Sequence, residues 1–391
     1  MALLDHYAAK LDGLKKTGNL RQFTPNMQQD KRIWVDGQEM LNLSSNDYLG
    51  LANDLDLRVQ FFEQMPMFKR HLTSSSSRLL TGNFPEYVAL EQCLSNTFLG
   101  RDALLFNSGY HMNIGILPAL ADAKTIILAD KLIHASMIDG IRLSTAHYVR
   151  YRHNDLAHLQ QLIEKYHDDA EIERIIVVTE SIFSMDGDET DLAALAALKR
   201  QFSKVMLYVD EAHAIGVRGE KGLGCAEQYG VINQIDFLVG TFGKAIASVG
   251  GYLICDPIIK AYLVNTMRPL IFSTALPPIN IAWTQFVFEQ MQNMAQARQH
   301  LQRTSQYLQQ QISALGFASP SSSHLVPIII GDSAVAVEKA KTLQQHGFYI
   351  MPVRPPTVPQ NSARLRVSLS AAITSQDLDP LVQLLANTNA N

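Results

Sequence analysis

The sequence is poor in cysteine, and that shortage excludes two kinds of site. Only three cysteines occur among 391 residues, at Cys93, Cys225 and Cys255. No CxxC pair or Cys/His group has the spacing of a zinc site, and an odd number of isolated thiols does not form a disulfide framework. We therefore predict no metal site, and three thiols that behave as small buried side chains in a reducing compartment.

The sequence also lacks an excess of basic charge and any long apolar run. Lys and Arg number 33 against 37 Asp and Glu, so the basic field that nucleic-acid binding requires is missing. No stretch approaches the ~18 apolar residues of a membrane span. Charged residues between Asp5 and Asp12 interrupt the start of the chain, which excludes a signal peptide. We expect a cytoplasmic protein with no nucleic-acid or membrane partner.

The middle of the chain alternates short apolar runs with amphipathic stretches. The runs predict six strands, at residues 103–107, 125–129, 174–179, 205–210, 236–240 and 251–255. Amphipathic stretches such as 156–166 and 191–202 predict helices between them. This alternation is typical of a mostly parallel α/β sheet buried on both faces, in which ligands bind beyond the carboxyl ends of the strands.

The two ends of the chain have other patterns. Apolar residues recur at helical spacing from Leu4 to Leu14, and a long helix is expected from about Ile281 to Leu315, with Gly316 at its end. Beyond it, two strands at 325–330 and 365–369 and a helix at 335–346 are expected. The chain is too long for one small core. We predict an N-terminal helix and arm at 1–45, a large domain at 46–285 and a small C-terminal α/β domain at 286–391.

Two strand ends carry residues that fit the chemistry of pyridoxal 5′-phosphate (PLP). Asp210 and His213 follow the first strand end, and Thr241 and Lys244 follow the second. A lysine amine forms a Schiff base with PLP, and a buried aspartate keeps the pyridine nitrogen protonated. His213 suits the phenolic oxygen of the ring or the carboxylate, and Thr241 offers a hydroxyl to the phosphate.

Further residues fit the same cofactor. Ser108, Gly109 and Tyr110 stand at a predicted helix start, where free N–H groups bind anions. His134 suits stacking on the ring, although a capping or core histidine would have the same pattern. Each feature alone is common, and a lysine after a glycine is usually surface charge. Their order along one sheet predicts a cofactor site.

The chain resembles the α-oxoamine synthases, fold-type I PLP enzymes, over nearly its whole length. The resemblance rests on seven motifs in order, at residues 43–51, 106–110, 134–136, 179–188, 210–213, 241–244 and 272–278. Residues 354–359 and 363–366 are similar to the branch that serves biotin synthesis. The resemblance implies a large domain with a mostly parallel seven-stranded sheet and a smaller C-terminal α/β domain.

The resemblance also implies roles around the cofactor. Lys244 carries PLP and moves the α-proton, while Asp210 pairs with the pyridine nitrogen. The other implied cofactor contacts are His213 and Ser184 at the phenolic oxygen, His134 on the ring face, Gly109 and Tyr110 in the cofactor site, Thr241 at the phosphate, and Thr274 at the phosphate of a neighbouring subunit. A Thr274 that reaches across implies a homodimer with shared active sites.

The substrate contacts implied by the resemblance are Arg21, Asn46, His134, Thr357 and Arg366, with Arg366 gripping the amino-acid carboxylate. The implied reaction is decarboxylative condensation of L-alanine with a pimeloyl thioester on coenzyme A or acyl carrier protein. Three alternatives stay open: a family member that uses glycine or serine with another acyl group, a fold-type I aminotransferase, and a PLP-binding regulatory module without turnover. The first forty residues contain no helix-turn-helix, which disfavours the regulator.

One segment departs from the family pattern. The family usually has glycines before Arg78, whereas this chain has Thr73 followed by four serines at 74–77. Glycine permits positive φ and close approach of the backbone to a ligand. The departure bears on the acyl-binding geometry and leaves the cofactor residues unchanged.

Overall fold

The computed structural model describes residues 3–389, and the chain divides into two compact units. The large unit comprises residues 54–183 and 189–298, and the small unit comprises residues up to 53, 184–188 and 299 onward. The domain boundaries predicted from the sequence lay between residues 45 and 46 and between residues 285 and 286. The N-terminal arm groups with the C-terminal segment because strand β3 (Gln38–Asn42) pairs with β12 (Phe348–Tyr349).

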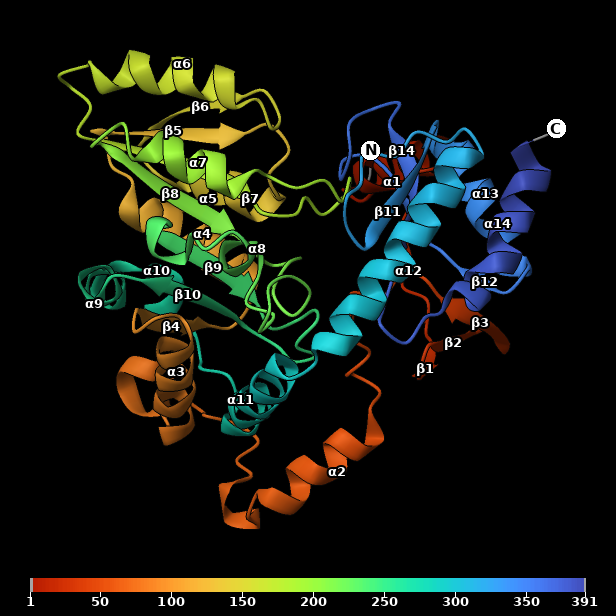
Figure 1. Ribbon diagram of the computed structural model, residues 1–391, viewed down its shortest axis with the longest axis horizontal. Coiled ribbons are helices and arrows are strands. Elements are labelled where there is room, and N and C mark those ends of the chain that lie inside the picture. The colour runs from red at the N-terminus through yellow and green to blue at the C-terminus, as the bar shows by residue number, and fades with distance from the viewer. Residues whose placement is uncertain (1–2, 390–391) are drawn as a thin grey trace. The chain divides into compact units, whose positions relative to one another are not determined.

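A seven-stranded sheet in the order β4-β10-β9-β8-β7-β5-β6 forms the centre of the large unit (Figure 1). Its strands are β4 (Asp102–Phe106), β5 (Thr125–Asp130), β6 (His147–Tyr151), β7 (Arg174–Glu180), β8 (Val205–Asp210), β9 (Phe237–Thr241) and β10 (Gly251–Cys255). β10 runs antiparallel to both of its neighbours, β4 and β9, and the other adjacent pairs of the sheet are parallel. The six predicted strands and the mostly parallel seven-stranded sheet are confirmed.

Helices lie on both faces of this sheet (Figure 1). The helices of the large unit are α2 (Leu55–Gln64), α3 (Pro85–Thr97), α4 (Gly109–Leu120), α5 (Ala135–Leu143), α6 (Leu156–His167), α7 (Leu192–Lys199), α8 (Cys225–Gln228), α9 (Pro257–Thr266), α10 (Arg268–Ile271) and α11 (Pro278–Gln292), with short turns of helix at Met67–Lys69, Arg78–Gly82 and Ile232–Gln234. Apolar residues of β4, β5 and β7–β10 pack against α4 and α5 in one buried cluster. That burial removes apolar surface from water and holds the carboxyl ends of the parallel strands in a fixed arrangement.

The small unit contains two sheets, in the orders β1-β2-β3-β12 and β11-β14-β13. Its other strands are β1 (Met27–Gln29), β2 (Arg32–Val35), β11 (Leu325–Gly331), β13 (Pro352–Val353) and β14 (Ala363–Ser368), and its helices include α13 (Ser333–Gln345) and α14 (Ser375–Asn389). The predicted strands at 325–330 and 365–369 and the helix at 335–346 are confirmed to within a few residues.

The single long helix expected from Ile281 to Leu315 is wrong. The structure has two helices there, α11 and α12 (Ala295–Ala314), which separate at Asn293. The Arg298 guanidinium donates to the carbonyls of Met291 and Gln292, at 2.7 and 3.1 Å. It therefore satisfies carbonyl groups that a helix end leaves without intrahelical partners. Gly316 does follow the end of α12, with φ of 80°.

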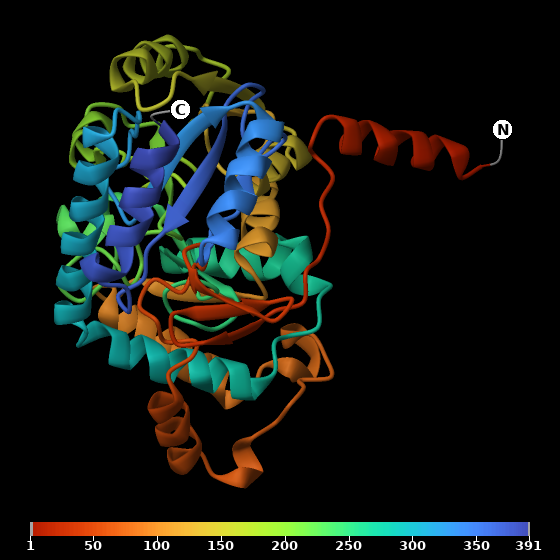
Figure 2. The same cartoon turned by 90° about the vertical axis from the view of Figure 1, so that its right-hand side faces the viewer.

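The predicted N-terminal helix is confirmed as α1 (Asp5–Lys16), which projects away from the sheets of its own unit (Figure 2). None of its residues is buried, and the apolar side chains of Tyr7, Leu11 and Leu14, together with that of the preceding Leu4, are exposed. Among the residues that the structure describes, no helix combines the length and apolar character needed to cross a bilayer.

Candidate active site

A cavity of about 180 Å³ lies in the large unit beside the carboxyl ends of β7, β8 and β9. Seven of the predicted site residues line it: Gly109, Tyr110, His134, Asp210, His213, Thr241 and Lys244. The cavity also contains the polar residues Asn113, Ser136 and Glu180, which were not predicted as site residues, although Ser136 and Glu180 belong to the motifs at 134–136 and 179–188. Strand ends far apart in sequence therefore meet at one pocket, as expected of a parallel sheet.

Lys244 lies close to His213 inside this cavity. The Lys244 Nζ is 2.8 Å from the His213 Nε2. Lys244 stands in the turn that follows β9, and its carbonyl accepts the Ala247 N–H at 2.8 Å. Ala247 has a φ of 49°, so a left-handed residue closes this turn. The amine thus faces a buried imidazole, in a setting where a lysine can act as nucleophile and base.

Asp210 ends β8, and each of its carboxylate oxygens is held by one N–H group. Oδ1 accepts the Ala212 backbone N–H at 2.9 Å, and Oδ2 accepts the Asn113 Nδ2 at 3.0 Å. Asp210 is 7% exposed, and His213 is 4% exposed. A buried, oriented carboxylate suits a cationic ring nitrogen, because an opposite charge stabilises the protonated form.

Backbone N–H groups at the start of α4 form the other side of the site. The Ser108 side chain caps the helix by accepting the His111 N–H at 3.1 Å, which confirms the predicted helix start. At Gly109, an added Cβ would stand 3.5 Å from the Thr241 Cβ, an ordinary van der Waals contact, so the start of α4 lies beside the end of β9. The Thr241 hydroxyl donates to the Gly250 carbonyl at 2.9 Å. Helix N-termini of this kind bind phosphate.

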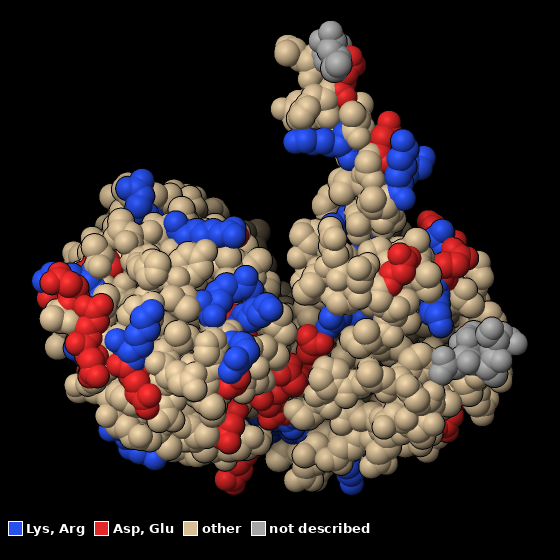
Figure 3. All heavy atoms as spheres, turned by 90° about the horizontal axis from the view of Figure 1, so that it is seen from above, with Lys and Arg blue, Asp and Glu red and all other residues tan. Residues whose placement is uncertain are grey.

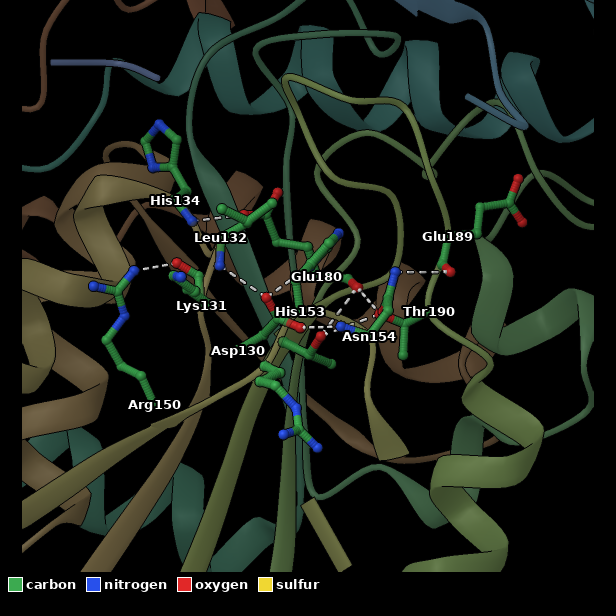
Figure 4. Close-up of polar contacts among 12 residues, drawn as sticks. Asp130, Lys131, Leu132, His134, Arg150, His153, Asn154, Glu180, Glu189 and Thr190 are labelled. Atoms are coloured by element: carbon green, nitrogen blue, oxygen red, sulfur yellow. Dashed lines mark hydrogen bonds and ion pairs between the residues drawn. The ribbon is translucent and has the colours of Figure 1, made fainter. Parts of the chain in front are cut away.

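His134 caps α5, and its backbone is held by a buried carboxylate. The His134 N–H donates to the Glu180 Oε1 at 2.6 Å (Figure 4). Its ring Nδ1 lies 2.8 Å from the Ser136 Oγ and accepts the Ser136 N–H at 3.2 Å. Burial lowers the pKa of His134 below its usual value, against the opposing effect of Asp210. The imidazole is therefore an oriented, neutral ring at the wall of the cavity.

The turn that leads from β5 to His134 has further side-chain partners (Figure 4). Asp130 is fully buried; its Oδ1 accepts the Leu132 N–H at 2.8 Å and lies 2.9 Å from the His153 Nδ1. Its Oδ2 accepts the Asn154 N–H at 2.9 Å. Polar backbone groups of a buried turn need such partners. This network fixes the position from which the His134 ring enters the site.

Glu180 is the second carboxyl group in the cavity. It pairs with Asp210 across β7 and β8 and is 3% exposed. Burial, and after it the neighbouring Asp210, raise the pKa of Glu180 to about 8, while Lys244 opposes the rise. With its pKa raised in this way, Glu180 holds a proton near neutral pH.

Other predicted site residues lie in the small unit. Arg366 on β14 donates through Nη1 to the Ser184 carbonyl at 2.8 Å and through Nη2 to the Asn46 Oδ1 at 3.0 Å. The Tyr48 hydroxyl donates to the same Asn46 oxygen at 3.1 Å. The structure therefore brings Asn46, Ser184 and Arg366 together within this unit.

Arg21 and Thr357 are both exposed and lie near one loop of the small unit. Arg21 donates to the Pro355 carbonyl at 3.2 Å, and the Thr357 N–H donates to the Arg354 carbonyl at 3.1 Å. Thr274, in the large unit, is exposed and does not line the cavity, and its carbonyl accepts the Asn107 Nδ2 at 2.7 Å.

The serine segment that replaces the family glycines packs within the large unit. Ser75 has a φ of 54°, a left-handed conformation that glycine adopts more easily. The buried Ser74 Oγ donates to the Ala275 carbonyl at 2.6 Å, and the Ser76 carbonyl accepts the Ala275 N–H at 2.9 Å. The segment thus keeps a backbone form typical of glycine and is tied to the chain beside Thr274.

Charges of both signs are interspersed on the face of the molecule that Figure 3 shows.

Cys225 and Cys255 are buried, and Cys93 is half-buried. Between residues 3 and 389, no group of three or more His, Cys, Asp or Glu side chains is placed to hold a metal ion.

Comparison with known proteins identifies the class. The family model for aminotransferases of class I and II matches residues 38–385, and the chain belongs to that family. The chain is 54% identical over 389 residues to the 8-amino-7-oxononanoate synthase of Haemophilus ducreyi, covering 98% of this chain and 100% of that protein.

Similarity to solved structures supports the same family. The serine palmitoyltransferase from S. paucimobilis with a bound PLP–myriocin aldimine matches with a TM-score of 0.89 and 28% identity, over 100% of this chain and 99% of that one. The 8-amino-7-oxononanoate synthase of Francisella tularensis matches with a TM-score of 0.74 and 26% identity, over 89% of this chain and 97% of that one. These matches confirm the α-oxoamine synthase family and the fold-type I architecture inferred from the motifs.

Proposed function

We propose that the chain is a PLP-dependent acyltransferase that condenses L-alanine with a pimeloyl thioester to give 8-amino-7-oxononanoate, CO2 and a free thiol. The observation that carries this proposal is the cavity that holds Lys244 Nζ at 2.8 Å from His213 Nε2 together with the buried Asp210. The extent of identity to a named 8-amino-7-oxononanoate synthase supports the choice of substrates.

The residues of the cavity fit PLP by their chemistry. Lys244 supplies the amine that binds the cofactor aldehyde, and Asp210 supplies the anion for the ring nitrogen. His213 and Ser184 suit the phenolic oxygen, and His134 suits the ring face. The phosphate partners are Ser108, Gly109, Tyr110 and Thr241, with Thr274 from a second subunit. When bound, PLP supplies the electron sink that makes the α-proton of the amino acid acidic.

The chain's own side chains would then handle the proton and the substrates. Lys244, as a free amine, takes the α-proton of the amino acid, and its half-buried place beside His213 suits it to that role. Arg366 binds the carboxylate with its planar fork, beside Asn46. Arg21 and Thr357 contact the acyl substrate. A bond forms between the α-carbon and the acyl carbon, the thioester C–S bond breaks, and loss of CO2 breaks the bond to the carboxylate.

A homodimer with shared sites is part of the proposal. Large apolar side chains are exposed on the large unit, namely Phe62, Met67, Phe68, Leu72, Leu79, Leu80 and, two residues from Thr274, Phe272. Exposed apolar patches of this kind mark association surfaces. If Thr274 acts on the partner's site, a mixed dimer of Lys244→Ala and Thr274→Ala chains contains one intact site. Mixing the two variants should then restore activity that neither has alone, and no gain on mixing would contradict the shared site.

A substrate panel tests the proposed reaction. Thiol release is measured with alanine, glycine and serine, each against pimeloyl, acetyl, succinyl and palmitoyl thioesters, and the amino-ketone product is identified by mass spectrometry. The proposal predicts turnover with alanine and a pimeloyl donor. The match to serine palmitoyltransferase makes serine with palmitoyl thioester the main competitor. Preference for that pair would overturn the proposed substrates. Conversion of an amino acid to its 2-oxo acid, with an aminated cofactor, would instead indicate an aminotransferase.

A further inference from the structure

Asn113 on α4 contacts two of the groups that surround the proposed cofactor. Its side chain is 2% exposed and lines the cavity. The Nδ2 group donates to the Asp210 Oδ2 at 3.0 Å and to the Ser136 Oγ at 3.0 Å. A carboxamide nitrogen carries two hydrogens, so both of its donors are used.

Tyr208 fixes the orientation of this amide. The Tyr208 hydroxyl donates to the Asn113 Oδ1 at 2.5 Å. Tyr208 is fully buried on β8, and burial raises the pKa of its phenol well above the usual value, which keeps the donor protonated. A flipped amide would turn its oxygen toward the Asp210 carboxylate, and two acceptors would then face each other. The amide therefore has one stable orientation.

The second Nδ2 hydrogen determines how the His134 ring is held. Because Nδ2 can only donate, the Ser136 Oγ accepts from it and directs its own proton to the His134 Nδ1, 2.8 Å away. The same Nδ1 also accepts the Ser136 N–H. A ring nitrogen that accepts is unprotonated, so the neutral His134 imidazole carries its hydrogen on Nε2.

The close contact of α4 and α5 makes this reach possible. Gly140 on α5 lies against the Asn113 carbonyl oxygen, and an added Cβ there would stand 2.3 Å from that oxygen. No side chain larger than glycine fits, so the two helices approach closely at this level. Asn113 thereby spans from α5 to the end of β8.

We propose that Asn113 is a positioning residue that orients, through one amide, both the Asp210 carboxylate at the ring nitrogen and the His134 imidazole on the ring face. The inference rests on the proposed PLP site. It adds a residue that links the Asp210 contact at the ring nitrogen to the His134 contact on the ring face. Tyr208 and Ser136 are the two ends of the same hydrogen-bond chain.

Four variants test this inference: Asn113→Ala, Ser136→Ala, Tyr208→Phe and, as a matched control on the exposed face of α9, Asn265→Ala. The measurements are the Kd of PLP by equilibrium absorbance, and the midpoint of the pH titration of the visible absorption band of the bound cofactor. Far-UV circular dichroism checks folding. The wild-type protein must bind PLP first, and its failure to do so would overturn the proposed function and not the role of Asn113.

Asn113→Ala removes a hydrogen bond to a charged group, so we expect the Kd of PLP to rise about 10- to 100-fold and the titration midpoint to move. Ser136→Ala should raise the Kd less and leave the midpoint in place, since it cuts only the His134 arm. Tyr208→Phe should move the midpoint in the same direction by a smaller amount. The inference is overturned if folded Asn113→Ala has the same Kd for PLP and the same titration midpoint as Asn265→Ala. It is also overturned if Ser136→Ala moves the midpoint as far as Asn113→Ala does. If Asn113→Ala does not fold, a Tyr208→Phe midpoint equal to that of the wild type overturns it.

Discussion

Replacing Glu180 by glutamine should make the cofactor-free protein more stable at high pH. The side chain is 3% exposed, and its pKa is raised from 4.5 to about 8, chiefly by burial. The folded state therefore holds a proton that the unfolded chain releases above pH 4.5, and wild-type stability falls as the pH rises toward 8. Glutamine keeps an oxygen for the His134 N–H and cannot ionise.

The magnitude follows from the size of the shift. A rise of the pKa from 4.5 to about 8 limits the stabilisation by Glu180→Gln, measured as the increase in the free energy of unfolding, to about 5 kcal/mol at high pH. Well below pH 4.5 no stabilisation from this source is expected. We compare the free energy of unfolding of Glu180→Gln with that of the wild type at each pH. The difference in favour of Glu180→Gln should be roughly 2–5 kcal/mol larger at pH about 9 than at pH about 5.

Urea unfolding of both proteins across this range measures the difference. Glu63→Gln, at an exposed position on α2, is the matched control and should show no trend beyond about 0.5 kcal/mol. A difference between Glu180→Gln and wild type that does not change with pH would refute the protonated, buried Glu180.

Three other substitutions have expected outcomes. Asp210→Asn removes the anion proposed at the ring nitrogen, and a loss of about 10- to 1000-fold in kcat is expected from steady-state assays, whereas unchanged kcat would contradict that role. Arg366→Lys replaces a planar fork of donors by a point charge, so the KM for the amino acid should rise about 10- to 100-fold while the Kd of PLP stays unchanged. A rise in the Kd of PLP with an unchanged KM would argue against a contact between Arg366 and the substrate carboxylate. Gly140→Ala forces a Cβ to 2.3 Å from the Asn113 carbonyl oxygen and should lower the stability measured by thermal unfolding by about 1–3 kcal/mol. The control is Gly13→Ala, where an added Cβ meets nothing within 4 Å, and it should lower stability by nothing. Equal effects of the two substitutions would count against the close contact between α4 and α5.

The central sheet was predictable because its strands are short apolar runs, and burial on both faces requires such runs. Strand β6 was not predicted, because it pairs only with β5 at the edge of the sheet and exposes His147, Tyr148 and Arg150. The break between α11 and α12 was also missed. No glycine or proline marks it, and the Arg298 side chain that supports it acts through the folded structure.

The cofactor residues were predictable for a different reason. Lys244 and Asp210 belong to local motifs at strand ends, and the chemistry of PLP requires their residue types. Asn113 carries no such local signal, and Glu180 entered the prediction only as a member of the motif at 179–188. Asn113 reaches Asp210 across 97 positions of sequence, and Glu180 reaches His134 across 46. Only the fold brings these partners together, although the position of Glu180 one residue past a buried strand run was a usable hint.

The most direct test is to treat the PLP-loaded protein with borohydride, digest it, and locate the reduced cofactor by mass spectrometry. The proposal predicts a pyridoxyl adduct on the ε-amine of Lys244 and on no other lysine. A peptide containing Lys244 that carries no adduct would contradict it.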